Sequence, residues 1–402
     1  MQLRLTSLFG LCVMTVVAWG LSSNRRKIDK RIIIGGLFLQ FTFALIVFRT
    51  DLGRAFFDSA GTLFKNILDC TDAGSQFVFG KNFGAELPET LFVFRVLPVI
   101  IFFSSLMSVL HHYGIVQIVV RGLGWVMQRT LGTSGAESLA AAANIFFGQT
   151  ESPLVIKPYL SRMTNSELMS LMVGGFATIA GSVMALYAGF GIDAGHLLTA
   201  SVISAPAALL IAKIMQPEVE TPLTAGSAQI DLPRETTNVM DALTTGATDG
   251  LKLALTVAAM IIAFLAMIAL INLGLQTVHE DLSFSIIVGR LFEPLAWCMG
   301  IDPVDTRRVG ELIGTKIVAN ELIAYHDLAN MTKNQLISTR SEIIATYALC
   351  GFANFGSIGI QIGGISAIVP ERKADLAQLG FRAMIGGTLA GFMTACIAGI
   401  LL

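Results

Sequence analysis

Charged residues are scarce in this chain. Only 14% of its 402 residues are Asp, Glu, Lys or Arg, while 54% are hydrophobic; an average soluble domain is about 25% charged. The net charge of −1 provides no basic field for nucleic acid. The five cysteines lack metal-ligand or disulfide spacing, and no Gly-x-x-x-x-Gly-Lys-[Ser/Thr] loop is present to cradle a nucleotide phosphate. These absences argue against a soluble fold, a nucleic-acid partner and ATP-driven transport.

Long apolar stretches take the place of the missing charge. A membrane-spanning helix needs about 20 mostly apolar residues, and the alternating pattern of transmembrane β-strands is not found. We therefore expect an all-α polytopic membrane protein with about eight transmembrane helices. The expected spans are Leu5–Ser23, Ile32–Phe48, Val96–Leu110, Leu168–Ile192, Ala194–Ala212, Leu253–Leu275, Ile343–Pro370 and Ala383–Leu402.

The distribution of basic residues predicts the orientation. Short loops on the cytoplasmic side are rich in Lys and Arg, and segment 23–31 carries five such residues directly after the first span. That order also favours a retained helix over a cleaved signal peptide. Segment 51–89 is acidic and patterned like an amphipathic helix on the membrane surface. We expect both termini outside, which for a bacterial inner membrane means periplasmic.

Two segments are too polar to face lipid and too apolar to be loops. Segments 133–163 and 302–331 each carry charged or amide residues at their centre. Irregular backbone at membrane depth is tolerated only where it is buried or lines a cavity. We expect two re-entrant helical hairpins, with Glu151 and Glu321 at their tips.

Three landmarks recur in the same order in the two halves of the chain. They are a polar residue followed by Glu, Leu-x-x-Met-Thr, and Gly-Phe-Ala-polar, which lie at 148–151, 160–164 and 175–178, and again at 318–321, 328–332 and 351–354. With three true spans per copy, the second copy is inverted, as in secondary transporters. A duplication that only builds a bundle is the alternative, but it would not need polar residues at matching depths.

This repeat divides the chain into four parts. We expect an N-terminal scaffold with an interfacial helix, a first repeat, a cytoplasmic linker and a second repeat. Each repeat would contain one hairpin and one helix broken by glycine and hydroxyl or amide residues. The expected bounds are 1–90 for the scaffold, 91–215 for the first repeat with hairpin 133–163 and broken helix 166–192, 216–246 for the linker, and 247–402 for the second repeat with hairpin 302–331 and broken helix 340–368.

The two tip carboxylates are the strongest functional signal. A charged side chain at the bilayer centre costs about 2.5–3.5 kcal/mol and marks a functional site by default. The alternative is structural pairing with Lys157, Lys316 or Arg95. For the glycines of the broken helices the alternative is close helix packing.

These residues resemble the signatures of one family, the concentrative nucleoside transporters. The motifs that carry the resemblance are Gly148-Gln149-Thr150-Glu151, Asn320-Glu321 with Ala324-Tyr325, and Gly351-Phe352-Ala353-Asn354-Phe355 with Ser357-Ile358-Gly359. The resemblance implies a sodium-driven symporter that imports nucleosides such as uridine by alternating access. It also implies a homotrimer.

The resemblance assigns roles to individual residues. It implies that Gln149, Thr150 and Glu151 read the nucleobase, on which Val183 packs. It implies that Glu321, Asn354 and Ser357 hold the ribose, with Phe352 beside them and Leu251 as a further candidate for the base pocket. A carboxylate, an amide and a hydroxyl are independently a suitable set of partners for ribose hydroxyls.

The coupling ion follows from the same resemblance. Asn144 and Thr178 match side-chain ligands of sodium, and Phe147 and Ile179 match carbonyl ligands. Asn144 favours sodium because some proton-coupled members lack it, so proton coupling stays an alternative. An intramembrane enzyme is disfavoured because no nucleophile–base pair or metal-ligand set recurs. A channel is the remaining rival and would show no saturable uptake.

Overall fold

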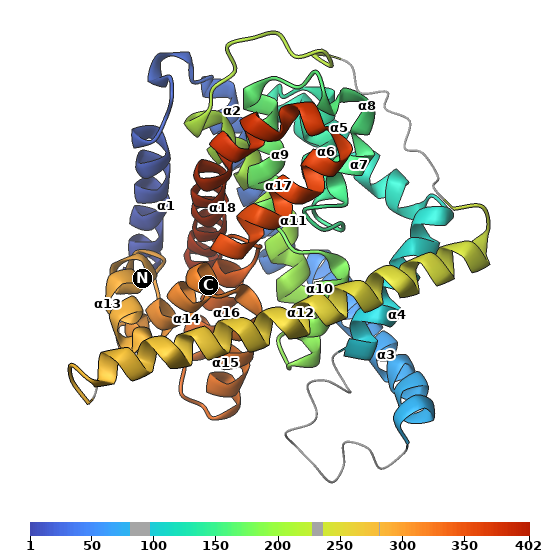
Figure 1. Ribbon diagram of the computed structural model, residues 1–402. Coiled ribbons are helices and arrows are strands. Elements are labelled where there is room, and N and C mark those ends of the chain that lie inside the picture. Colours follow the sequence, from blue (N-terminus) through green and yellow to red (C-terminus); the bar gives the residue numbers. More distant parts are fainter. Residues whose placement is uncertain (81–96, 227–235, 281) are drawn as a thin grey trace.

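The computed structural model describes residues 1–80, 97–226, 236–280 and 282–402 (Figure 1). Within these ranges all regular structure is helical, which confirms the expectation of an all-α fold. The helices that frame the molecule are α1 (Gln2–Gly20), α2 (Lys30–Arg49), α3 (Asp51–Phe79), α4 (Leu97–His112), α5 (Ile115–Leu131), α11 (Ala194–Met215), α12 (Val239–Gln276), α13 (Phe284–Cys298) and α18 (Lys373–Leu401). Two 3-10 turns, Arg25–Lys27 and Pro370–Arg372, join them at one end.

Five helical segments of the described residues are long and apolar enough to cross a membrane. They are Gln2–Gly20, Lys30–Arg49, Asn165–Gly189, Ala194–Met215 and Pro370–Leu401, and the bent pair Pro98–His112 and Ile115–Leu131 adds a sixth if it is one span. The pair is bent by 76°. Of the eight expected spans, 253–275 lies within the 38-residue α12, and the helix expected at 343–370 is broken into the two short helices Thr339–Leu349 and Phe355–Ile368.

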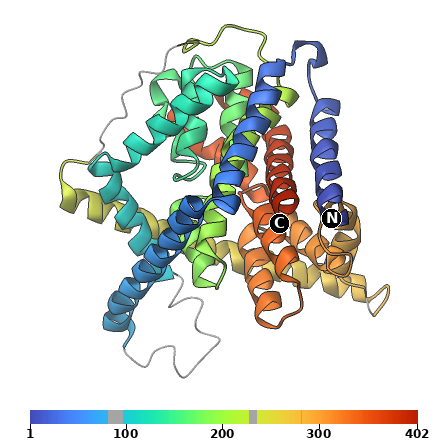
Figure 2. The ribbon, with the colours of Figure 1, turned by 180° about the vertical axis from the view of Figure 1, so that it is seen from behind.

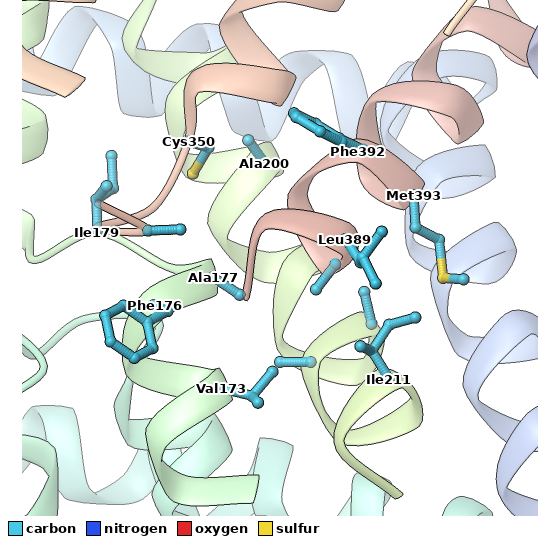
Figure 3. Close-up of a cluster of buried hydrophobic side chains, with 14 of the residues drawn as sticks. Val173, Phe176, Ala177, Ile179, Ala200, Ile211, Cys350, Leu389, Phe392 and Met393 are labelled. Carbon is cyan, nitrogen blue, oxygen red and sulfur yellow. The ribbon is translucent and has the colours of Figure 1, made fainter. Parts of the chain in front are cut away.

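Small residues let the central helices approach closely. A Cβ at Gly387 of α18 would lie 2.3 Å from Cβ of Phe176, and one at Gly386 would lie 2.8 Å from Cγ2 of Val173. The α18 backbone therefore packs directly on the helix that carries both residues. Figure 3 shows the apolar cluster at this crossing, which also includes Ile211 of α11 and Leu389 of α18.

Two helical hairpins enter this core. Hairpin 1 consists of α6 (Gly135–Ala143), a non-helical tip, α7 (Ser152–Val155) and α8 (Lys157–Leu160). Hairpin 2 consists of α14 (Thr306–Val318) and α15 (Glu321–Lys333). Both correspond in position to the segments that the sequence marked as re-entrant.

The hairpins open at opposite ends of the molecule. At the base of hairpin 1, Glu137 is paired at 2.8 Å with Lys213 near the end of α11. The loop that follows hairpin 2 lies at the other end, where Arg340 donates to the carbonyls of Gly300 (3.1 Å) and Gly399 (2.7 Å). Opposite entry is the geometry that an inverted repeat requires.

Each hairpin is followed by a helix that breaks in its middle. Broken helix 1 is α9 (Asn165–Ala177) and α10 (Gly181–Gly189), and broken helix 2 is α16 (Thr339–Leu349) and α17 (Phe355–Ile368). Gly351 lies in the second break with φ +98°, and a Cβ there would lie 2.4 Å from the carbonyl oxygen of Phe176. Only glycine fits this left-handed position and this close approach.

The two chain ends lie side by side (Figures 1 and 2). Arg4 donates to the carbonyl oxygen of Leu402 over 2.7 Å. At the opposite end, Arg382 donates to the carbonyls of Leu21 and Met215. Helix α3 covers most of the segment expected on the membrane surface, whose residues 81–89 lie outside the described ones, as do 227–235 of the expected linker.

Candidate substrate and ion site

A buried carboxylate joins three helices at the centre of the molecule. Glu321 is the first residue of α15, and its Oε1 accepts a hydrogen bond from the hydroxyl of Tyr187 on α10 (3.2 Å). Its Oε2 accepts from Nδ2 of Asn354, the residue before α17 (2.8 Å). Tyr187 also stacks on Tyr325, one helical turn after Glu321, with ring centroids 4.3 Å apart. Hairpin 2 and both broken helices therefore meet at one acceptor.

Local capping explains why these polar groups lie here. The side chain of Asn320 accepts from the amide of Ile323 (3.0 Å), which starts α15 and places Glu321 in its first turn. The amide oxygen of Asn354 accepts from the Ser357 amide (2.8 Å) and starts α17 in the same way. Helix N-termini favour negative charge and polar ligands. The side chain of Asn354 thus makes two hydrogen bonds: its oxygen accepts from the Ser357 backbone amide, and its nitrogen donates to the Glu321 carboxylate.

The tip of hairpin 1 lies against both broken helices. A Cβ at Gly175 would lie 2.9 Å from Cβ of Gln149 and 2.6 Å from Nε2 of Gln361, which donates to the carbonyl of Met172 (3.0 Å). The buried Oε1 atoms of Gln149 and Gln361 accept no hydrogen bond from any described residue. Two unsatisfied acceptors in one place are costly unless a ligand or water serves them.

The other residues of this tip contact different partners. Thr150 lies beside α17, since a Cβ at Gly364 would be 2.7 Å from its Cγ2. Glu151 is exposed, and its Oε2 accepts from the Gly148 amide (3.2 Å). No ion pair within the described ranges joins Glu151 or Glu321 to Lys157 or Lys316, and Arg95 lies outside those ranges.

The four residues matched to a sodium site lie where hairpin 1 meets the first break. Asn144 ends α6, accepts from Ser152 Oγ (2.7 Å), and its Nδ2 would lie 2.8 Å from a Cβ at Gly174. Thr178 Oγ1 donates to the carbonyl of that same Gly174 (2.9 Å). In the described part of the chain, the carbonyls of Phe147 and Ile179 accept no hydrogen bond. Neutral amide, hydroxyl and free carbonyl oxygens suit a sodium ion at an unwound helix.

Of the remaining expected residues, Val183 and Phe352 lie near the centre of the site, whereas Leu251 does not. Val183 is buried on α10, one turn before Tyr187 and on the same face, and Phe352 is half-buried in the second break. Leu251 lies on α12, which packs mainly against α4, and 47% of its surface is exposed. No described contact brings Leu251 to the hairpin tips.

Four polar or aromatic residues of this region had been given no role in the site from the sequence, although Tyr325 belongs to one of the motifs. Tyr187, Tyr325 and Gln361 contact the centre directly, and Lys316 lies beneath it, donating to the carbonyls of Ala348 and Cys350 at the end of α16. For Tyr187 the signal was available, because it follows Val183 by four residues on one helix. Lys316 was considered only as a partner of a tip carboxylate.

The chain matches three family profiles that together cover most of its length. They are "Na+ dependent nucleoside transporter C-terminus" over residues 196–399, the corresponding N-terminus over 9–82, and "Nucleoside recognition" over 93–194. The first of these alone covers half of the chain.

Among similar proteins is solute carrier family 28 member 3 of Eptatretus stoutii, which is 46% identical over 98% of this chain. The chain spans only 60% of that relative's length. An uncharacterized transporter of Haemophilus influenzae is 43% identical over 98% of this chain and 97% of its own.

A solved structure is similar over the whole fold. It shows CNTnw in an inward-facing, substrate-bound state and superimposes with a TM-score of 0.93 at 40% identity, covering 99% of this chain and 98% of that one. The named relatives are transporters, not enzymes. With its two inverted hairpins, its two broken helices and these matches, the chain belongs to the Na+-dependent concentrative nucleoside transporter family.

Proposed function

We propose that this protein imports nucleosides across the bacterial inner membrane together with sodium. The observation that carries the proposal is the buried Glu321 carboxylate, held by Tyr187 from one broken helix and by Asn354 from the other. A charge at this depth is costly without a function. A carboxylate beside an amide is a suitable acceptor for the hydroxyls of a ribose.

The base would bind on the opposite side of the same centre. Gln149, Thr150 and Glu151 form the tip of hairpin 1, and Val183 offers an apolar surface on α10. The free acceptor of Gln149 supports this assignment, because a base edge carries N–H donors that would satisfy it. Uridine is the probe we choose; other pyrimidine and purine nucleosides present the same ribose.

Sodium would act by fixing hairpin 1 against broken helix 1. Asn144 and Thr178 both approach Gly174, and the carbonyls of Phe147 and Ile179 are free to complete the set. An ion that joins these two elements orders the base side of the site, so sodium and nucleoside bind cooperatively. The coupling is necessarily reciprocal.

Transport would follow by alternating access, with the hairpins and broken helices moving against the remaining helices. We place the end that carries Arg25, Arg26, Lys27 and Arg382 in the cytoplasm, because basic residues concentrate on that side. The adjacent termini then lie in the periplasm. The homotrimer rests on the family resemblance alone.

Uptake of labelled uridine into proteoliposomes tests the proposal. We expect rapid, saturable uptake with sodium outside and its collapse when choline replaces sodium. Empty liposomes and an excess of unlabelled uridine are the controls. Uptake that follows a proton gradient without sodium would contradict the coupling, and non-saturable flux would indicate a channel.

A further inference from the structure

Lys316 is a buried cation held by backbone oxygens. Its side chain is 0% exposed, and its Nζ donates over 3.0 Å to the carbonyl of Ala348 and over 3.0 Å to that of Cys350. Helix α16 ends at Leu349, so these are carbonyls at its carboxyl end. That end carries a partial negative charge of about half a unit, which attracts cations.

The ammonium has no acidic partner in ion-pair contact within the described residues. A lysine is almost never fully buried unless it is paired. Lys213, a buried lysine among the described residues, follows that rule, since it is paired with Glu137 at 2.8 Å and Glu218 at 3.3 Å. Lys316 instead donates to neutral carbonyl oxygens at an unwound helix, which are ligands that a bound alkali ion also uses, and the Glu321 carboxylate acts on its charge only from beyond ion-pair distance.

The internal repeat allows the surroundings of Lys316 to be compared with the corresponding part of the first repeat. Aligning 175–178 with 351–354 makes Cys350 the counterpart of Gly174, whose carbonyl accepts from Thr178 in the proposed sodium site. Both are the last residue before Gly-Phe-Ala. The lysine thus lies beside the break of the second repeat, as the proposed ion lies beside the break of the first.

The two hairpins also differ at the position of Asn144, the proposed side-chain ligand of sodium. Aligning Glu151 with Glu321 makes Gly314 the counterpart of Asn144. Gly314 has no side chain to offer an ion, and a Cβ there would lie 1.4 Å from Cγ1 of Val288. The second repeat therefore has no amide side chain at this position, which packs on α13, and the polar group of this hairpin that reaches the end of α16 is Lys316, two residues later.

We propose that Lys316 is a tethered cation that fills, in the second repeat, the place taken by sodium in the first. This inference rests on the proposed sodium-coupled function. It limits the transporter to one coupling ion per nucleoside, and it makes the two halves of the site unequal. The ribose side around Glu321 is complete without sodium, whereas the base side at hairpin 1 is completed by the ion.

Removal of the charge tests this inference through the sodium dependence of uptake. Wild-type uptake should depend on sodium to first order. In Lys316→Ala the carbonyls of Ala348 and Cys350 are free to bind a cation from solution. We therefore expect uptake to fall at low sodium concentration and to become second order in sodium. Ethylammonium, which replaces the lost side chain, should restore uptake. First-order dependence in Lys316→Ala at wild-type rates, or second-order dependence in the wild type, would overturn the proposal.

A second measurement covers the case in which Lys316→Ala does not fold. Lys316→Gln keeps an N–H donor and loses only the charge, and Lys252→Gln is the control at an exposed lysine. We expect the melting temperature of purified Lys316→Gln to rise with sodium or ethylammonium more than that of the wild type or Lys252→Gln. An equal rise in all three refutes the tethered cation. This readout needs no transport, so it separates failure of this inference from failure of the proposed function.

Discussion

The Glu321→Gln substitution removes the central charge and keeps the shape of the side chain. Tyr187 and Asn354 retain partners, because the new amide oxygen accepts one hydrogen bond and its nitrogen can donate to the Tyr187 hydroxyl. The local fold therefore loses two charge-assisted hydrogen bonds, and the hydroxyl proton of Tyr187 loses its acceptor. We expect a loss of about 1–2 kcal/mol in the free energy of unfolding, not a loss of folding.

The effect on binding should be larger. A hydrogen bond to a charged group contributes about 1.5–3 kcal/mol, so losing one from a ribose hydroxyl weakens uridine binding by about 10- to 150-fold. An analogue without the hydroxyl never made that bond. We expect 2′,3′-dideoxyuridine to bind the wild type weakly and to lose little further affinity in the variant.

Isothermal titration of purified protein with both ligands in sodium measures this difference directly. The wild type and variant form a double-mutant cycle with uridine and the dideoxy analogue. The reasoning is refuted if both ligands weaken by the same factor in the variant, or if uridine binding changes less than twofold while the melting temperature is unchanged.

Three further substitutions, one of them with a matched control, probe other parts of the fold. Asn144→Ala should raise the half-saturating sodium concentration of uptake by about tenfold, through loss of one ligand; an unchanged value would exclude this residue from the ion site. Lys213→Met should destabilise the purified protein by about 3–5 kcal/mol, because buried carboxylates lose their cation, and a melting temperature like that of the wild type would contradict this. Gly387→Ala should cost about 1–3 kcal/mol by overpacking against Phe176, whereas Gly74→Ala, with open space around it, should be neutral or slightly stabilising in the same melting assay.

Much of the fold could be predicted because the bilayer restricts the choices. In a membrane, an uncharged stretch of about 20 residues can form little other than a spanning helix. Polar interruptions such as 133–163 and 302–331 must then be buried within the protein. The structure has hairpins at those two segments and breaks near Thr178 and Asn354. The length of α12 escaped prediction, because the polar residues 239–246 were assigned to the linker but belong to the same helix.

The candidate site could be predicted only where polarity is unusual. Glu321 and Asn354 stand out in an apolar run, and the structure joins them by a hydrogen bond. Tyr187 lies one helical turn after Val183, but that spacing is a weak signal, since an aromatic residue in a span is ordinary. The role of Lys316 could not be inferred either, because its partners are main-chain carbonyls and every residue carries one.

The breaks at 178–180 and 350–354 have a consequence for how such a protein can change over generations. They direct the ends of four short helices toward the centre, and the partial charges at those ends belong to the main chain. No single side-chain replacement can erase them. In the proposed site, side chains such as Val183 can therefore be exchanged to favour a different base while the polar framework persists, so new specificities need not begin by rebuilding the site.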